Sequence, residues 1–153
     1  MNNTVVKLFG LLFVMMISMA ENMDVYMYEK VEFLNIFWTA VYSICLIWFL
    51  KSTSRFIKTD KWSSRIYNVV WIYYIVGTLL SLMLFIGLVD LSPLNLEKIV
   101  YVPFAGLMNI VYSLQNVFKA EADFLVFGIC CLIMSLLGYL FKKKDFNTEQ
   151  KNV

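Results

Sequence analysis

The stretch IYNVVWIYYIVGTLLSLMLFIGLV, residues 66–89, runs for 24 residues without a charged side chain. A helix needs about 20 apolar residues to cross the ~30 Å hydrocarbon core of a bilayer. Similar runs occur in VEFLNIFWTAVYSICLIWFL, residues 31–50, and in FLVFGICCLIMSLLGYLF, residues 124–141. Charged residues flank all three. We therefore expect at least three transmembrane helices and an all-α, multi-pass membrane helix bundle.

The composition of the chain agrees with this expectation. Its 153 residues are 61% hydrophobic and 16% charged, whereas soluble domains are about 45–50% apolar and about 25% charged. No internal repeat or Gly/Ser-rich linker divides the chain, so residues 1–153 are expected to form a single membrane domain. The chain has no histidine, which excludes imidazole metal sites and His-dependent catalysis. A net charge of +2 without a long basic tract argues against a nucleic-acid partner.

The N-terminal apolar run LFGLLFVMMISMA, residues 8–20, admits two interpretations. It follows Lys7 and ends in Ser18-Met19-Ala20, a small-x-small pattern typical of a secretory signal peptide with its cleavage site. The alternative is a short, uncleaved first helix over residues 5–20. That helix would bring the bundle to about four transmembrane helices. Both interpretations place Glu21 outside the cell.

The stretch IVYVPFAGLMNIVYSLQNVF, residues 99–118, is long enough to span but amphipathic. Asn109, Ser113 and Asn116 are spaced i, i+4 and i+7 and share one helical face. Two structures fit this pattern. One is a fifth crossing whose polar stripe faces other helices, and the other is a re-entrant or interfacial helix that stays on one side.

The distribution of lysine and arginine favours the second structure. If residues 99–118 do not cross, ten basic residues gather on one side of the membrane and three on the other. If they do cross, the division is seven against six. Because cytoplasmic loops carry an excess of Lys and Arg, we expect an even number of crossings and a cytoplasmic C-terminal tail.

Small and polar residues form stripes on the apolar stretches. They are Gly128, Cys131, Ser135 and Gly138 on the last helix, Gly77 and Ser81 on the helix of residues 66–89, and Asn35, Thr39 and Ser43 on the helix of residues 31–50. Small faces let two helices approach closely and form hydrogen bonds between them. The stripes predict packing faces, either inside one bundle or at a seam with a partner membrane protein or a second copy.

The loop KSTSRFIKTDKWSSR, residues 51–65, is the most polarised part of the chain. Its candidate lipid-facing residues are Lys51, Arg55, Lys58, Lys61, Trp62 and Arg65. Such a loop can lie on anionic lipid at ~1 kcal/mol per base, or it can serve only to retain this side in the cytoplasm. On the opposite side, Glu32 is expected in a first helical turn, with Lys30 on a different side of that helix.

The remaining chemistry is sparse. Cys45, Cys130 and Cys131 do not form a C-x-x-C motif, and we expect them to be packing residues. No nucleophile elbow, phosphate-binding loop or zinc-protease motif is present, so neither a cofactor nor an enzymatic activity is expected.

Two classes of function remain. The first is a small non-enzymatic integral membrane protein that acts by helix–helix or partner contact, as an accessory, regulatory or immunity-type subunit. The second is a small channel or passive transporter with a polar path lined by Asn109, Ser113 and Asn116. The Lys-, Asn- and Ile-rich residue choice is typical of an AT-rich genome and favours a bacterial inner (plasma) membrane.

Overall fold

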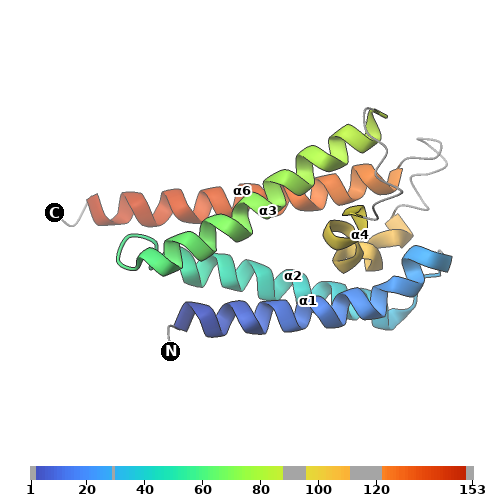
Figure 1. Cartoon of the computed structure of the whole chain (residues 1–153), viewed down its shortest axis with the longest axis horizontal. Coiled ribbons are helices and arrows are strands. Elements are labelled where there is room, and N and C mark those ends of the chain that lie inside the picture. The colour runs from blue at the N-terminus through green and yellow to red at the C-terminus, as the bar shows by residue number, and fades with distance from the viewer. Residues whose placement is uncertain (1–2, 29, 88–95, 111–121, 151–153) are drawn as a thin grey trace.

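Four long helices follow the apolar runs of the chain in the computed structural model (Figure 1), which describes residues 3–28, 30–87, 96–110 and 122–150. The long helices are α1 (Asn3–Tyr28), α2 (Phe33–Ser54), α3 (Lys61–Phe85) and α6 (Ala122–Gln150). Two short elements, α4 (Leu96–Tyr101) and the 3₁₀ helix η2 (Val102–Leu107), lie between α3 and α6 in the sequence. The described residues contain no strand, and the all-α prediction is confirmed.

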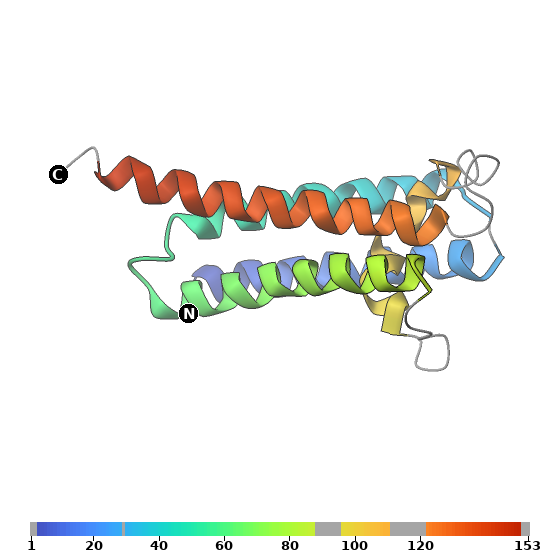
Figure 2. The ribbon, with the colours of Figure 1, turned by 90° about the horizontal axis from the view of Figure 1, so that it is seen from above.

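The long helices alternate in direction, as Figures 1 and 2 both show. The start of α1, the turn between α2 and α3, and the end of α6 therefore lie at one end of the bundle. Thr4 and Ser63 form a 2.6 Å hydrogen bond there between α1 and α3. We call this the basic end, defined by Lys7, Lys51, Arg55, Lys58, Lys61, Arg65, Lys142, Lys143 and Lys144. The opposite, acidic end contains Glu21, Asp24 and Glu32 together with Lys30.

Two of the long helices extend beyond the expected spans, and a capping group accounts for one of these extensions. Asp60 precedes α3 and accepts the backbone N–H groups of Trp62 and Ser63 at 3.1 and 3.2 Å. This N-cap satisfies donors that the first turn leaves unpaired, so α3 begins five residues before the expected residue 66. At the other end of the bundle, α1 continues eight residues beyond Ala20, to Tyr28.

Residues 96–110, here called the inserted segment, pack near the acidic end between the α1–α2 pair and the α3–α6 pair (Figures 1 and 2). α3 ends and α6 begins at this same end, and the described residues between them form only the two short elements α4 and η2 and one further helical turn. The rest of the predicted amphipathic stretch, with Ser113 and Asn116, lies outside the described residues.

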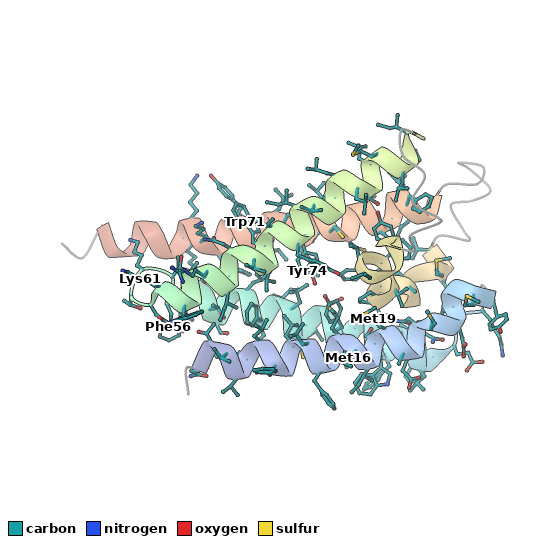
Figure 3. All side chains as sticks on the ribbon, viewed as in Figure 1. Met16, Met19, Phe56, Lys61, Trp71 and Tyr74 are labelled. Atoms are coloured by element: carbon teal, nitrogen blue, oxygen red, sulfur yellow. The ribbon has the colours of Figure 1, made fainter. Side chains whose placement is uncertain are left out.

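Large apolar side chains project from the outer faces of the long helices (Figure 3). Phe13, Ile44, Val69 and Leu136, one from each long helix, are each at least half exposed. Each long helix contains an apolar stretch of 21 to 25 residues, enough to cross the hydrocarbon core of a bilayer. The fold is that of a membrane-embedded helix bundle.

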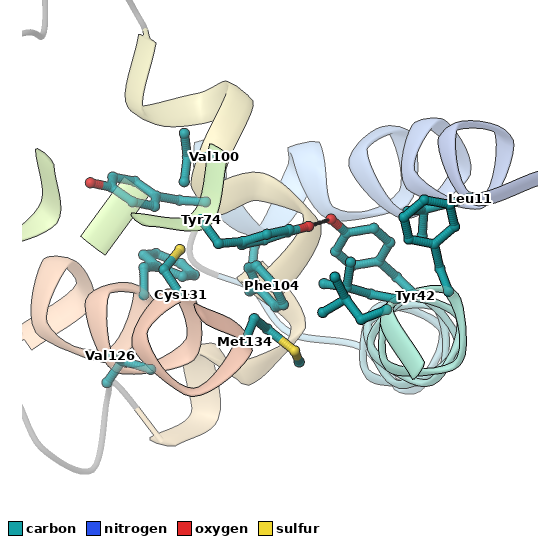
Figure 4. Close-up of a cluster of buried hydrophobic side chains, with 14 of the residues drawn as sticks. Leu11, Tyr42, Tyr74, Val100, Phe104, Val126, Cys131 and Met134 are labelled. Atoms are coloured by element: carbon teal, nitrogen blue, oxygen red, sulfur yellow. Dashed lines mark hydrogen bonds between the residues drawn. The ribbon is translucent and has the colours of Figure 1, made fainter. Parts of the chain in front are cut away.

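The interior is rich in aromatic rings. Phe104 of the inserted segment packs against both Tyr42 and Tyr74, with ring centroids 5.4 and 6.4 Å away (Figure 4). Tyr101 stacks on Phe127 of α6 with centroids 5.1 Å apart. Such pairs contribute about 0.5–1.5 kcal/mol each beyond the apolar area that they bury. The inserted segment therefore completes the core and is not a surface loop.

Candidate functional site

A buried polar cluster joins α1, α2 and η2. Ser18 Oγ donates a 3.0 Å hydrogen bond to the carbonyl oxygen of Pro103. Asn22 Nδ2 lies 2.9 Å from Thr39 Oγ1 and 3.2 Å from Ser18 Oγ. All three side chains are at most 2% exposed. We call Ser18, Asn22, Asn35 and Thr39, with the backbone of Pro103 and Gly106, the polar clamp.

Thr39 is the centre of the clamp because its hydroxyl group takes part in three hydrogen bonds. It donates to the carbonyl oxygen of Asn35 at 2.8 Å and accepts from Asn22 and from the N–H of Gly106 at 3.2 Å. A Cβ atom on Gly106 would lie 2.3 Å from Thr39 Oγ1 and 2.4 Å from the Asn35 carbonyl oxygen. Only glycine allows the inserted segment to approach α2 this closely.

Asn35 connects the clamp to the acidic end. Its Oδ1 accepts the backbone N–H of Glu32 at 2.7 Å, and its Nδ2 donates to the carbonyl oxygen of Glu21 on α1. One amide thus ties the start of α2 to α1. Within the described residues, Asn22 Oδ1 is the one polar atom of the clamp that is buried without a hydrogen-bond partner.

The predicted stripe on α2 divides into two roles. Asn35 and Thr39 contribute to the clamp, whereas Ser43 is half-buried and donates to the carbonyl oxygen of Thr39 in its own helix. Ser18 and Asn22 were not predicted as packing residues. A sequence signal for them existed, since Ser18 and Asn22 are polar residues spaced i, i+4 and therefore share one face of the helix.

The small residues of α3 and α6 face each other within the chain. A Cβ atom on Gly77 would lie 3.1 Å from Cys131 Sγ, and one on Gly128 would lie 3.0 Å from Ser81 Oγ. Ser135 donates to the Cys131 carbonyl in its own helix, and its own carbonyl oxygen accepts from Trp71 Nε1 at 2.9 Å. This geometry fits the first of the two interpretations of the stripe, packing inside one bundle.

Gly138 lies at the end of this face nearest the basic end. Tyr67 Oη donates to its carbonyl oxygen at 2.5 Å, and a Cβ atom there would lie 2.8 Å from Trp71 Cδ1. Two aromatic side chains of α3 thus pack directly against the α6 backbone. Helix contacts of this kind require a small residue at the contact point.

The predicted polar path has one described member. Asn109 is exposed, while Ser113 and Asn116 lie outside the described residues. In the middle of the bundle, the hydroxyl groups of Tyr42 and Tyr74 are hydrogen-bonded to each other beside Phe104 (Figure 4). A water-filled path along the bundle axis would have to separate these buried rings.

Aromatic rings accompany the charges of the basic end. Lys7 Nζ lies 5.4 Å from the ring centroid of Trp48 and 5.5 Å from that of Phe56. Arg65 and Lys142 lie over Trp62 and Trp71, and Lys142 also donates to Asn68 Oδ1 at 3.2 Å. Cation–π contacts contribute about 0.5–1 kcal/mol at exposed sites. The basic residues of the predicted loop therefore form one positively charged surface together with Lys7 of α1 and Lys142 of α6.

At the acidic end, the expected separation of Lys30 from Glu32 is wrong. Lys30 Nζ lies 2.7 Å from Glu32 Oε1, and both side chains are mostly exposed. The expectation assumed a helix through both residues, but α2 begins at Phe33 and Glu32 has extended backbone angles. In extended backbone, residues two apart point to the same side. The hydrogen bond and charge of Lys30 lower the pKa of Glu32.

Cys45, Cys130 and Cys131 are free thiols. Among the residues that the structure describes, no three His, Cys, Asp or Glu side chains are grouped closely enough to hold a metal ion. No protein-family model matches the chain, and no curated protein or solved structure matches it.

Proposed function

We propose that this chain is a small, non-enzymatic integral membrane protein that acts by contact, as an accessory, regulatory or immunity-type subunit. The observation that carries the proposal is the closed interior. At mid-bundle Tyr42, Tyr74 and Phe104 fill the space between the helices, and the clamp side chains bond to one another. Among the residues whose side-chain burial the structure describes, no charged side chain is buried, unlike the interior of a proton- or ion-coupled transporter. The outer helix faces are then the surfaces left for a partner.

Two measurements test this proposal. In living cells, a photo-crosslinking residue is placed at Phe13, Val76 or Leu136, which are exposed on α1, α3 and α6. We expect adducts with one membrane protein from one of these faces and none from the others. The purified protein in liposomes should give no more leakage of ions or small solutes than protein-free liposomes. Solute flux without any adduct would favour the channel or passive-transporter alternative.

We further propose that the basic end is cytoplasmic, in a bacterial inner membrane, and meets anionic lipid. The support is the charge asymmetry of the bundle, with nine lysine or arginine residues at one end. Cytoplasmic segments of membrane proteins carry this excess. The C-terminal tail would then be cytoplasmic, because α6 ends at the basic end.

Retention of α1 belongs to the same proposal. Thr4 and Ser18 are buried and bonded to α3 and η2, so cleavage after Ala20 would remove both contacts from the bundle. The intact mass of the protein, purified by a C-terminal tag, should include residues 1–20. A mass that lacks those residues would show that they act as a signal peptide.

A further inference from the structure

A pocket of about 430 Å³ opens at the basic end between α1 and α2. It is lined by Lys7 on α1, by Lys51 and Arg55 at the end of α2, and by the rings of Trp48 and Phe56. No acidic residue lines it, and none of these three cations forms an ion pair within the described residues. Three uncompensated positive charges around one pocket create a strong attraction for an anion.

An apolar groove of about 550 Å³ continues from this pocket along α1 and α2. The two share Asn3, Lys7 and Trp48, and the groove continues to Val14 and Cys45. Gly10 lies on its α1 side, where a Cβ atom would have no neighbour within 4 Å. The space beside Gly10 is therefore open, and the groove leads from the charged end toward the middle of the bundle.

We propose that the pocket and the groove together bind one anionic phospholipid, with the phosphate at Lys7, Lys51 and Arg55 and one acyl chain in the groove beside Gly10. The positively charged pocket would face the lipid headgroup, and the apolar groove would face the acyl chain. Lys7 lies where the pocket meets the groove, at the position expected for the lipid's glycerol phosphate. The rings of Trp48 and Phe56 hold its ammonium group there. A free phosphate would use the pocket but leave the groove empty. The site rests on the proposed membrane location, with the basic end in an anionic leaflet.

Binding is measured on the full chain in neutral detergent micelles, with phosphatidylglycerol and phosphatidylcholine whose acyl chains are brominated. The signal is the part of the tryptophan quenching that disappears in Trp48→Phe. We expect phosphatidylglycerol to be preferred. The double variant K51Q/R55Q should bind it roughly thirty-fold more weakly, about five-fold per base, with binding of phosphatidylcholine unchanged. The double variant K61Q/K143Q, an equal charge change at two exposed sites outside the pocket, is the matched control.

The groove is tested with Gly10→Leu, whose Cβ atom would have no neighbour within 4 Å and whose side chain would occupy the groove. We expect this variant to lose the quenching from Trp48, while Ala40→Leu, at an exposed site on α2 outside the groove, retains it. Circular dichroism and gel filtration show that each variant remains folded. Equal binding of the two lipids would overturn the proposal, as would quenching that Gly10→Leu leaves intact. Full competition by glycerol phosphate would also overturn it, since the occupant would then be a soluble anion. The crosslinking and flux measurements do not depend on these results. The proposal of a contact function and the proposal of a lipid site are therefore tested independently.

Discussion

The hydroxyl of Thr39 shows how a polar residue is placed inside an apolar bundle. It bonds at once to its own helix, to Asn22 of α1 and to the backbone of Gly106. In the sequence, Asn35, Thr39 and Ser43 are equivalent members of one stripe. Their roles differ because the partner of Thr39 comes from a segment 67 residues away, which no local pattern reports. The stripe itself was predictable, but the carbonyl and N–H groups that it meets were not.

Thr39→Val should destabilise the protein by about 1–3 kcal/mol, although valine has nearly the same shape as threonine. The cost arises because the buried N–H of Gly106 loses its acceptor and the amide of Asn22 loses the nearest of its acceptors. Ser43→Ala removes a hydroxyl that bonds only within its own helix, and should change stability by less than about 0.5 kcal/mol. Thermal unfolding in detergent measures both. Equal losses would show that Thr39 has no special role.

At the scale of the helical elements, the inserted segment depends on a close approach of two backbones. Gly106→Ala brings a methyl group within 2.4 Å of the carbonyl oxygen of Asn35, which α2 holds in place. We expect a loss of about 3 kcal/mol, at the upper end of the usual cost of overpacking. Gly10→Ala meets nothing and should stabilise α1 by about 0.5–1 kcal/mol through helix propensity. Unfolding temperatures that move in the same direction for both variants would contradict this account.

The α3–α6 contact gives a second prediction at this scale. Gly138→Leu displaces Trp71, whose indole N–H donates to the Ser135 carbonyl, and should cost about 1–3 kcal/mol. Leu136→Ile, on the exposed face of the same helix, should change little. If Gly138→Leu left the unfolding temperature of the monomer unchanged but abolished crosslinked multimers, the face would have to be assigned to an oligomer seam instead.

Hydropathy predicted three of the four long helices, because each contains a long apolar run that must satisfy its backbone polar groups internally. α1 was ambiguous because Ser18-Met19-Ala20, at the end of a short apolar run, resembles the cleavage site of a signal peptide, although Ser18 is buried in the bundle. The inserted segment was ambiguous for a related reason. Its apolar side chains face the core on several sides, so its composition does not distinguish a crossing helix from one enclosed by others. The distribution of lysine and arginine favoured a segment that does not cross, because the number of crossings determines how many basic residues lie on each side of the membrane.

At the scale of the whole molecule, the alternation of the helices predicts which sites share a side of the membrane. In a background with Cys45, Cys130 and Cys131 replaced by alanine, single cysteines at Lys58 and Lys143 should both be protected from a membrane-impermeant maleimide in intact cells. A cysteine at Asp24 should react, because Asp24 lies at the acidic end. Labelling of residue 143 from outside together with protection of residue 58 would require an odd number of crossings after the loop.

The inserted segment also gives the bundle unequal ends. Near the acidic end, residues 96–110 occupy space between the helix pairs, and α3 leans away from α1 and α2 toward that end (Figure 1). A membrane protein that is broader at one end has a larger cross-section in one leaflet and displaces more lipid there than in the other leaflet. Such a body fits best where the leaflet around its broad end is stretched, so copies of this protein should collect on membrane that bulges toward the acidic end and should resist its flattening.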